Sequence, residues 1–225
     1  MIIVTGASKG LGAAISQRLL SQGHRVVGLA RETSQIEFES IDCDVSDYTS
    51  VKQAAKHVKK LSENVDAVIN AAGIAAMNLA VTTDEKTVAR VIQTNLMGTI
   101  HCCQLFAPLM MRHKQGAFIN FSTIAVALAL KGESVYAASK AGVEAFSRAF
   151  AREMADFGVR VNCIAPGPIK TDLLRGITEA QIDKITAQQI NTKRFEKSDV
   201  CDLVEWLLDV KAESLSGQVL HIGGV

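Results

Sequence analysis

The chain has 225 residues, of which 48 % are hydrophobic and 21 % charged, a balance typical of globular proteins and not of disordered ones. Its formal net charge is +1, and no basic block is present that could follow a phosphate backbone, so we expect no nucleic-acid partner. No run approaches the roughly 18 apolar residues of a membrane span. These features predict one cytoplasmic domain, residues 1–225, with no membrane contact.

The cysteines and histidines show no metal-binding pattern. Five cysteines, an odd number, form no C-x-x-C pair, and five histidines form no H-x-x-x-H pair. We therefore expect reduced thiols and no metal site.

Short apolar runs rich in β-branched residues alternate with longer segments of helical period, as in repeated βαβ units. The expected strands are 1–5, 25–30, 39–42, 67–70, 117–121, 160–164 and 218–222. The expected helices are 11–22, 47–62, 84–113 with a candidate break near Asn95, 135–157, 178–190 and 198–210. This order predicts an α/β fold, a Rossmann-type doubly wound parallel sheet of about seven strands with helices on both faces.

A glycine-rich turn follows the first expected strand. Gly6, Gly10 and Gly12 are spaced G-x-x-x-G-x-G and lead directly into an apolar helix. A helix N-terminus has unpaired N–H groups, and glycines let a pyrophosphate come close to them. The alternative is a tight β-to-α connection without a ligand.

Each of the two tyrosines has a lysine four residues later, so this spacing alone identifies nothing. Tyr136 and Lys140 follow an apolar strand and the hydroxyl pair at 122–123, whereas Tyr48 and Lys52 begin an earlier helix. We interpret Tyr48 and Lys52 as part of a solvated helix face.

The pair Tyr136 and Lys140 suits proton transfer to a carbonyl. Such a carbonyl gains negative charge on oxygen when it accepts hydride, and a phenol beside it can donate a proton. Residues four apart on a helix are neighbours, so the Lys140 ammonium is expected to favour ionisation of Tyr136, whose ordinary pKa is about 10.

These motifs, taken in order, resemble the short-chain dehydrogenase/reductase family, and the resemblance spans essentially the whole chain. Within the family it is most similar to 3-oxoacyl-acyl-carrier-protein reductases and related carbonyl reductases. The matching motifs are T-G-x-x-x-G-x-G at 5–12, Asp44-Val45, Asn70-Ala71-Ala72-Gly73 with Ala71 as a departure, Asn95, Ser122-Thr123, Tyr136-x-x-x-Lys140, 166–171 and 217–224.

The resemblance implies a nicotinamide coenzyme and its contacts. Asp44 would accept from the adenine amino group, the segment 70–73 would line the ribose side, and Ile169 and Thr171 would contact the carboxamide. The full expected set is Gly6, Ser8, Lys9, Gly10, Leu11, Gly12, Arg31, Asp44, Val45, Asn70, Ala71, Gly73, Tyr136, Lys140, Pro166, Gly167, Ile169 and Thr171.

Coenzyme preference should be set at the end of the second strand. Ala30 stands where relatives that prefer NAD carry Asp, and Arg31 follows it, with Lys9 as a second cation in the glycine turn. Arginine can bind a phosphate bidentately. We expect NADP(H) over NAD(H), while Glu32 keeps the alternative open because it could neutralise Arg31 or reach the ribose.

The resemblance implies four catalytic residues: Asn95, Thr123, Tyr136 and Lys140. The hydroxyl that orients the carbonyl falls on Thr123, with Ser122 as the alternative if the strand end shifts by one residue. Asn95 would hold a relay water that serves Lys140, or it marks a helix kink, or both.

The implied reaction is hydride transfer between NADP(H) and a ketone or secondary alcohol, such as reduction of a small or carrier-bound 3-oxoacyl group. The substrate loop should lie between 171 and 198, where Asp172, Leu173, Leu174 and Arg175 suggest a partly apolar rim with one cation. The alternatives are a catalytically silent NAD(P)-binding sensor or scaffold and an NAD-dependent alcohol dehydrogenase.

A ridge of alanines follows the helix at 135–157. Ala137, Ala141, Ala145 and Ala149 recur at four-residue intervals, which allows another helix to approach closely. Internal packing and a subunit interface both remain open from the ridge alone, and the resemblance implies a homodimer or homotetramer.

Overall fold

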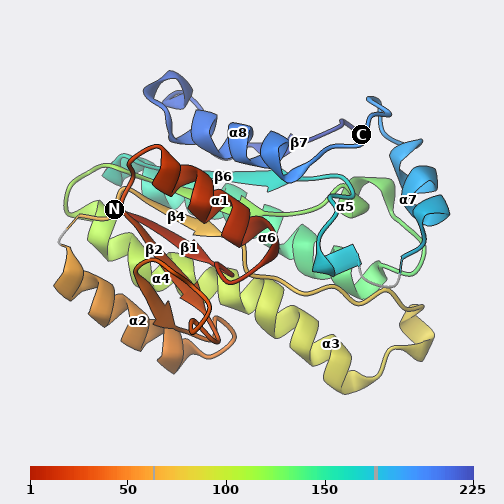
Figure 1. Ribbon diagram of the computed structural model, residues 1–225, viewed down its shortest axis with the longest axis horizontal. Coiled ribbons are helices and arrows are strands. Elements are labelled where there is room, and N and C mark those ends of the chain that lie inside the picture. The colour runs from red at the N-terminus through yellow and green to blue at the C-terminus, as the bar shows by residue number, and fades with distance from the viewer. Residues whose placement is uncertain (63, 175–176) are drawn as a thin grey trace.

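Seven parallel strands form one sheet in the order β3-β2-β1-β4-β5-β6-β7 (Figure 1). The structure is a computed structural model that describes residues 1–62, 64–174 and 177–225. The strands are β1 Ile2–Thr5, β2 Val26–Ala30, β3 Ser40–Asp42, β4 Ala67–Asn70, β5 Gly116–Phe121, β6 Val159–Ala165 and β7 Val219–His221.

The helices cover both faces of this sheet. Helices α1 (Gly10–Ser21) and α8 (Lys197–Leu208) pack on one face, and α2 (Tyr48–Leu61), α4 (Gly98–Met111) and α6 (Ser134–Met154) pack on the other (Figure 1). The shorter helices are α3 Glu85–Ile92, α5 Ala125–Leu128, α7 Glu179–Thr186, the π-helical η2 Gln93–Met97, and the 3-10 turns η1 Ala80–Thr82, η3 Ala155–Phe157, η4 Asp172–Leu174 and η5 Val210–Ala212.

Two hydrophobic layers explain why the central strands are apolar along their whole length. On the α1 and α8 face, Ile15 and Leu207 are fully enclosed, and on the other face Phe106 and Phe118 are. Strands β1 and β4 are buried at every position, as expected for a parallel sheet covered on both sides. The expected fold class is confirmed: this is a single Rossmann-like domain.

The order of the strands reverses beside β1. The chain builds β2 and β3 outward from β1 and then crosses over to form β4 on the opposite side of β1. The carboxyl ends of β1 and β4 therefore diverge from one another into loops on opposite faces. Such a switch point leaves a crevice where ligands bind in open α/β sheets.

The element boundaries differ from the expected ones where short-range packing decides them. The helix expected over 84–113 is divided by the π-helical turn at Gln93–Met97, which contains Asn95, so the break near this residue is found. The helix expected over 178–190 is only Glu179–Thr186, because a capping box between Thr178 and Gln181 begins it and irregular turns succeed it. Helix α5 was not predicted, since four residues carry no readable period.

The cysteines, Tyr48 and the membrane expectation can each be compared with the structure. All five cysteines are buried and free.

Tyr48 is 44 % exposed at the start of α2, and its ring meets the His101 ring edge-on, with 5.4 Å between the ring centroids. It therefore lies on a largely solvated face, as expected. Within the described ranges no helix has the length and apolar character needed to cross a membrane.

Candidate active site

A pocket of about 600 Å³ opens at the carboxyl ends of the strands. Its walls come from the loops that follow β1, β2, β3, β4, β5 and β6, together with residues of α3, α6 and α7. This volume is within the range of pockets that hold small ligands and cofactors. The loops that follow the strands therefore place residues from distant parts of the sequence around one cavity.

The glycine turn forms one wall of the pocket. Gly6 and Gly10 have φ values of +69° and +62°, which favour glycine, and both line the cavity. A Cβ on Gly12 would lie 2.3 Å from the Gly6 carbonyl oxygen, so Gly12 allows α1 to start against the turn and does not itself line the pocket. No side chain caps the start of α1. Its N–H groups thus remain available for a pyrophosphate.

The end of β2 supplies a cation at the rim of the same pocket. Arg31 is exposed there and, among the described residues, forms no ion pair. The Glu32 carboxylate accepts a 3.0 Å hydrogen bond from Ser34 Oγ and so is not paired with Arg31. The strand ends in Ala30, which carries no acidic group.

The loop after β3 forms the adjoining wall. Asp44 and Val45 both line it, and one Asp44 oxygen accepts hydrogen bonds from the Ser46 N–H at 2.9 Å and Ser46 Oγ at 2.6 Å. These bonds fix the carboxylate in its place on this wall. Of the other expected coenzyme residues, Ser8, Lys9, Leu11, Ala71, Gly73, Pro166, Gly167, Ile169 and Thr171 also line the pocket.

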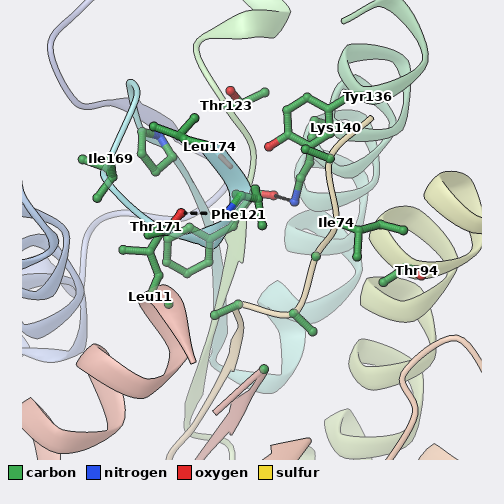
Figure 2. Close-up of a pocket in the computed structure, with 18 of the residues that line it drawn as sticks. Leu11, Ile74, Thr94, Phe121, Thr123, Tyr136, Lys140, Ile169, Thr171 and Leu174 are labelled. Atoms are coloured by element: carbon green, nitrogen blue, oxygen red, sulfur yellow. Dashed lines mark hydrogen bonds between the residues drawn. The ribbon is translucent and has the colours of Figure 1, made fainter. Parts of the chain in front are cut away.

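Tyr136, Lys140 and Thr123 converge at one end of the pocket, opposite Ile169 and Thr171 (Figure 2). Lys140 Nζ donates a 2.8 Å hydrogen bond to the Phe121 carbonyl at the end of β5. Both reactive side chains are largely buried, with Tyr136 6 % and Lys140 5 % exposed. Helix α6 and strand β5 therefore present a phenol, an amine and a hydroxyl to the same space.

Burial governs the acidity of both groups. It lowers the pKa of Lys140 from 10.5 to about 8, because the ammonium loses its hydration. Burial also raises the pKa of the Tyr136 phenol well above its ordinary value, and the nearby Glu133 carboxylate adds to this rise, while an interaction with the Thr123 hydroxyl opposes it. The expected lowering of the phenol pKa by Lys140 is therefore not found, because burial outweighs it.

The hydroxyl pair at the end of β5 divides into two roles. Ser122 is 4 % exposed, and its Oγ donates a 2.6 Å hydrogen bond to the buried Glu144 carboxylate. Thr123 is half-buried at the pocket, where its Oγ1 accepts a hydrogen bond from the Ala125 N–H at 3.2 Å and keeps its own proton for another partner. Of the two, Thr123 has its hydroxyl at the pocket beside the Tyr136 phenol, whereas the Ser122 hydroxyl is bonded to Glu144.

Asn95 lies behind the pocket wall and not in it. Its Oδ1 accepts from the Ile74 N–H at 2.9 Å, and its Nδ2 donates to the Ile74 carbonyl at 2.9 Å and to Ser139 Oγ at 3.0 Å. A Cβ on Gly73 would lie 3.3 Å from Asn95 Oδ1 and 3.5 Å from Lys140 Nζ, so this glycine separates the two side chains. The amide thus holds the loop after β4 against α6, as the helix-break interpretation expects.

The structure places Asn70 elsewhere than at the coenzyme site. Its Nδ2 donates to Asn120 Oδ1 at 2.8 Å, and Asn120 Nδ2 donates to Ser147 Oγ at 2.8 Å, all in the buried interior. Asn70 does not line the pocket. Successive side chains of a strand point to opposite faces of the sheet, so the position of Asn70 in β4 decides which face its side chain reaches. Here it reaches the core under α6.

Apolar residues that no motif predicted enclose the remaining part of the pocket. Leu173 and Leu174, which were expected at the substrate rim, do line it, whereas Arg175 lies outside the described residues. The unpredicted lining residues on this side include Ile74, Met77, Leu130, Glu133, Ile177 and Ile185. They come from loops and from α7, which have no recognisable motif.

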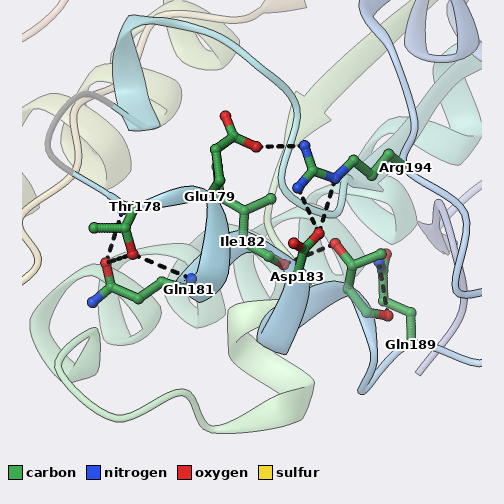
Figure 3. A network of polar contacts seen from close by, with 8 residues as sticks. Thr178, Glu179, Gln181, Ile182, Asp183, Gln189 and Arg194 are labelled. Carbon is green, nitrogen blue, oxygen red and sulfur yellow. Dashed lines mark hydrogen bonds and ion pairs between the residues drawn. The ribbon is translucent and has the colours of Figure 1, made fainter.

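Polar contacts begin helix α7 and join it to the segment that follows it (Figure 3). The Thr178 side chain accepts from the Gln181 N–H to begin the helix, and Arg194 pairs with Glu179 and Asp183 on its outer side. These ion pairs are exposed and so contribute little to stability. Ile185 of α7 and Ile177, which precedes this helix, both line the pocket.

Comparison with known proteins agrees with this arrangement. The family model for the short chain dehydrogenase matches residues 1–182. The chain is 34 % identical to the 3-oxoacyl-[acyl-carrier-protein] reductase FabG of Staphylococcus epidermidis, over 99 % of this chain and 96 % of that one. It is 33 % identical to carbonyl reductase family member 4 of Danio rerio, over 100 % and 96 %.

A solved structure, that of ElxO with NADP bound, superposes with a TM-score of 0.89 at 25 % identity, over 98 % of this chain and 96 % of that one. The fold agrees with that of this solved structure. The chain therefore belongs to the short-chain dehydrogenase family, and it is an oxidoreductase that acts on C=O and CH–OH groups with a nicotinamide coenzyme.

Proposed function

We propose that the protein reduces ketones with NADPH and that 3-oxoacyl groups are among its substrates. The observation that carries the proposal is the convergence of Tyr136, Thr123 and Lys140 at the end of a pocket whose other end has a glycine turn and an unpaired arginine. The relatives named for 3-oxoacyl and carbonyl reduction support the substrate class.

The pocket fits a dinucleotide along its length. The uncapped start of α1 and the backbone at Gly6 and Gly10 suit a pyrophosphate, and Arg31 suits a phosphate on the adjoining ribose. Asp44 and Val45 would flank adenine, and Ile169 and Thr171 would face the nicotinamide. When bound, NADPH supplies the hydride.

The side chains at the other end manage the proton. Thr123 Oγ1 donates a hydrogen bond to the substrate carbonyl oxygen and orients it. The Tyr136 phenol, kept protonated by its raised pKa, donates its proton to the same oxygen as negative charge develops there. Lys140, which stays charged below about pH 8, stabilises the phenolate that remains. Asn95 keeps the adjacent loop in place and so acts as a positioning residue.

Purified protein with NADPH and a panel of ketones, including acetoacetyl-coenzyme A as a 3-oxoacyl thioester, tests the proposal. Loss of absorbance of the reduced nucleotide is expected with at least one member of the panel. Tight NADPH binding without any turnover would instead favour the catalytically silent sensor or scaffold. Turnover of secondary alcohols with NAD alone would favour the alcohol dehydrogenase alternative.

Replacement of Arg31 by alanine tests the choice of coenzyme. Because the Arg31 guanidinium has no partner among the described residues, it can bind the 2′-phosphate that distinguishes NADPH from NADH. A charge-assisted hydrogen bond contributes roughly 1.5–3 kcal/mol, so the Kd for NADPH should rise about 10- to 100-fold while that for NADH stays nearly constant. Arg152→Ala, an exposed change on α6, is the control. Equal loss of both nucleotides in the Arg31 variant would reject the NADPH preference.

Replacement of Thr123 by valine tests the carbonyl-orienting hydroxyl. Valine keeps the branched shape of threonine but removes the hydroxyl, so kcat/KM should fall about 10- to 100-fold, while loss of the 3.2 Å bond from the Ala125 N–H should lower the melting temperature only slightly. The matched change Ser122→Ala breaks the bond to Glu144 and should lower the melting temperature while affecting turnover less. The opposite pattern, with turnover lost mainly in the serine variant, would assign the role to Ser122.

The exposed alanine ridge supports a homodimer or homotetramer. Ala145 and Ala149 are exposed and Ala137 and Ala141 are half-buried, so the chain itself leaves most of the ridge uncovered. Small side chains at four-residue spacing suit the close approach of an identical helix. We propose that α6 packs against its counterpart in a second copy.

A further inference from the structure

We propose that Glu133 selects the substrate, and that its carboxylate accepts a hydrogen bond from a hydroxyl or ammonium group carried next to the reacting carbonyl. This proposal rests on the proposed function, since it concerns the substrate end of the same pocket. It adds a preference among the ketones that the enzyme reduces: those that bear a hydrogen-bond donor close to the carbonyl group react faster than matched ketones without one.

Glu133 is a buried acid with no internal partner among the described residues. Its side chain is in the pocket wall, and the residue is only 8 % exposed. Although it occupies the position before α6, its carboxylate caps none of the helix N–H groups. Only its backbone is bonded, with its N–H donating to the Leu130 carbonyl at 3.2 Å and its carbonyl accepting from the Ala137 N–H at 2.6 Å. Among the described residues, the Glu133 carboxylate in the pocket wall therefore has no hydrogen-bond or ion-pair partner.

A carboxylate in this situation is unfavourable without a ligand. Burial raises the pKa of Glu133, because the charged carboxylate loses hydration there. Buried charges in proteins are normally paired or hydrogen-bonded, because desolvation costs several kcal/mol otherwise. A donor on the substrate would supply the missing partner.

A second buried acid, on α6 itself, shows the contrast. Glu144 is also 8 % exposed, but it accepts from Ser122 Oγ at 2.6 Å and lies 3.7 Å from Arg148. Its charge is thus used within the protein. Among the described residues, the Glu133 carboxylate has no such contacts. It lies about one turn before Tyr136, near the phenol that is proposed to donate its proton to the substrate carbonyl oxygen. Glu144 on α6 therefore has a structural task, and Glu133 just before that helix has one toward the ligand.

Matched ketone pairs test this recognition. We expect the wild type to prefer 3-hydroxybutan-2-one over its near-isostere 3-methylbutan-2-one, and aminoacetone over butan-2-one, as ratios of kcat/KM. In Glu133→Leu each ratio should fall by at least about 10-fold, since a hydrogen bond to a charged group is removed. Glu133→Gln keeps an acceptor oxygen and should retain most of the hydroxyl ratio, whereas it should lose the ammonium ratio with the charge. Glu153→Gln, on an exposed turn of the same helix, is the control and should change neither ratio.

Thermal unfolding without nucleotide or substrate gives an independent measurement. Glu133→Leu removes a buried carboxylate that has no partner among the described residues, so it should raise the melting temperature by at least about 2 °C. A lower melting temperature would show that Glu133 has a structural partner, and the proposal would be overturned. Unchanged ratios in an active Glu133→Leu enzyme would also overturn it. A wild type that reduces no ketone at all would instead reject the proposed function.

Discussion

Replacing Tyr136 by phenylalanine should lower kcat for ketone reduction by about 10³-fold, within the usual range for loss of a positioned general acid. The ring is 6 % exposed and packed in the wall, and phenylalanine preserves that packing while removing only the hydroxyl. The Kd for NADPH should therefore stay within about twofold, since the residues proposed to contact the pyrophosphate and adenine line the other end of the pocket. Nucleotide fluorescence measures the binding, and absorbance of NADPH measures the turnover.

The chain provides its own control for this variant. Tyr48 also has a lysine four residues later, but it is 44 % exposed on α2, outside the pocket. Tyr48→Phe should leave turnover unchanged. If the two variants lost activity equally, or if Tyr136→Phe retained it, the proton transfer could not be assigned to Tyr136.

Replacing Lys140 by methionine should lower kcat about 10²-fold and should also change how stability depends on pH. Methionine fills a similar volume but provides neither the charge near the Tyr136 phenolate nor the hydrogen bond to the Phe121 carbonyl. The effect on kcat should be smaller than that of Tyr136→Phe, because lysine acts on the phenol and not directly on the carbonyl.

The pH dependence arises from the lowered pKa of Lys140. In the nucleotide-free protein that pKa is about 8, against 10.5 in the unfolded chain, a difference of roughly 3 kcal/mol. Below about pH 8 both states bind the proton, and burial of the ammonium destabilises the fold by this amount in full. Between about pH 8 and 10.5 the unfolded state binds more protons, so the free energy of unfolding rises with pH, and it levels off above that range.

Urea unfolding of the wild type and Lys140→Met at several values between pH 7 and 10 measures this contribution. The free energy of unfolding of the wild type should rise relative to that of the variant across this range, because the other titrating groups are common to both proteins. Parallel curves for the two proteins would show that Lys140 does not titrate with a lowered pKa.

The sequence was sufficient for the architecture because its periods are strong. Apolar runs such as 67–70 and 117–121 can be buried on both sides only in a covered parallel sheet, and helical stripes supply the cover. The glycine spacing at 6–12 likewise predicts a close turn, which Gly6 and Gly10 form with positive φ. These features depend on residues close together in the chain, so they can be predicted from a single sequence.

Features that depend on the meeting of distant segments were not predictable. The side chain of Asn70 turns into the core and pairs with Asn120, a choice set by the parity of β4 and by α6 above it. The Tyr136 pKa is governed by burial, which no spacing records. Glu133 carries no motif, and only the structure reveals that its carboxylate has no partner among residues 1–62, 64–174 and 177–225.

The π-helical turn at Gln93–Met97 has a consequence for how this scaffold can vary. An α-helix rotates side chains by about 100° per residue, and the wider turn accommodates an extra residue without shifting the helix on its C-terminal side. Thr94 and Arg90 can therefore face the cavity while α4 keeps its own phase against the sheet. The direction in which the side chains of α3 point is thus independent of the direction in which those of α4 point. Substitutions in α3 can therefore reshape the cavity without disturbing the packing of α4 against the sheet.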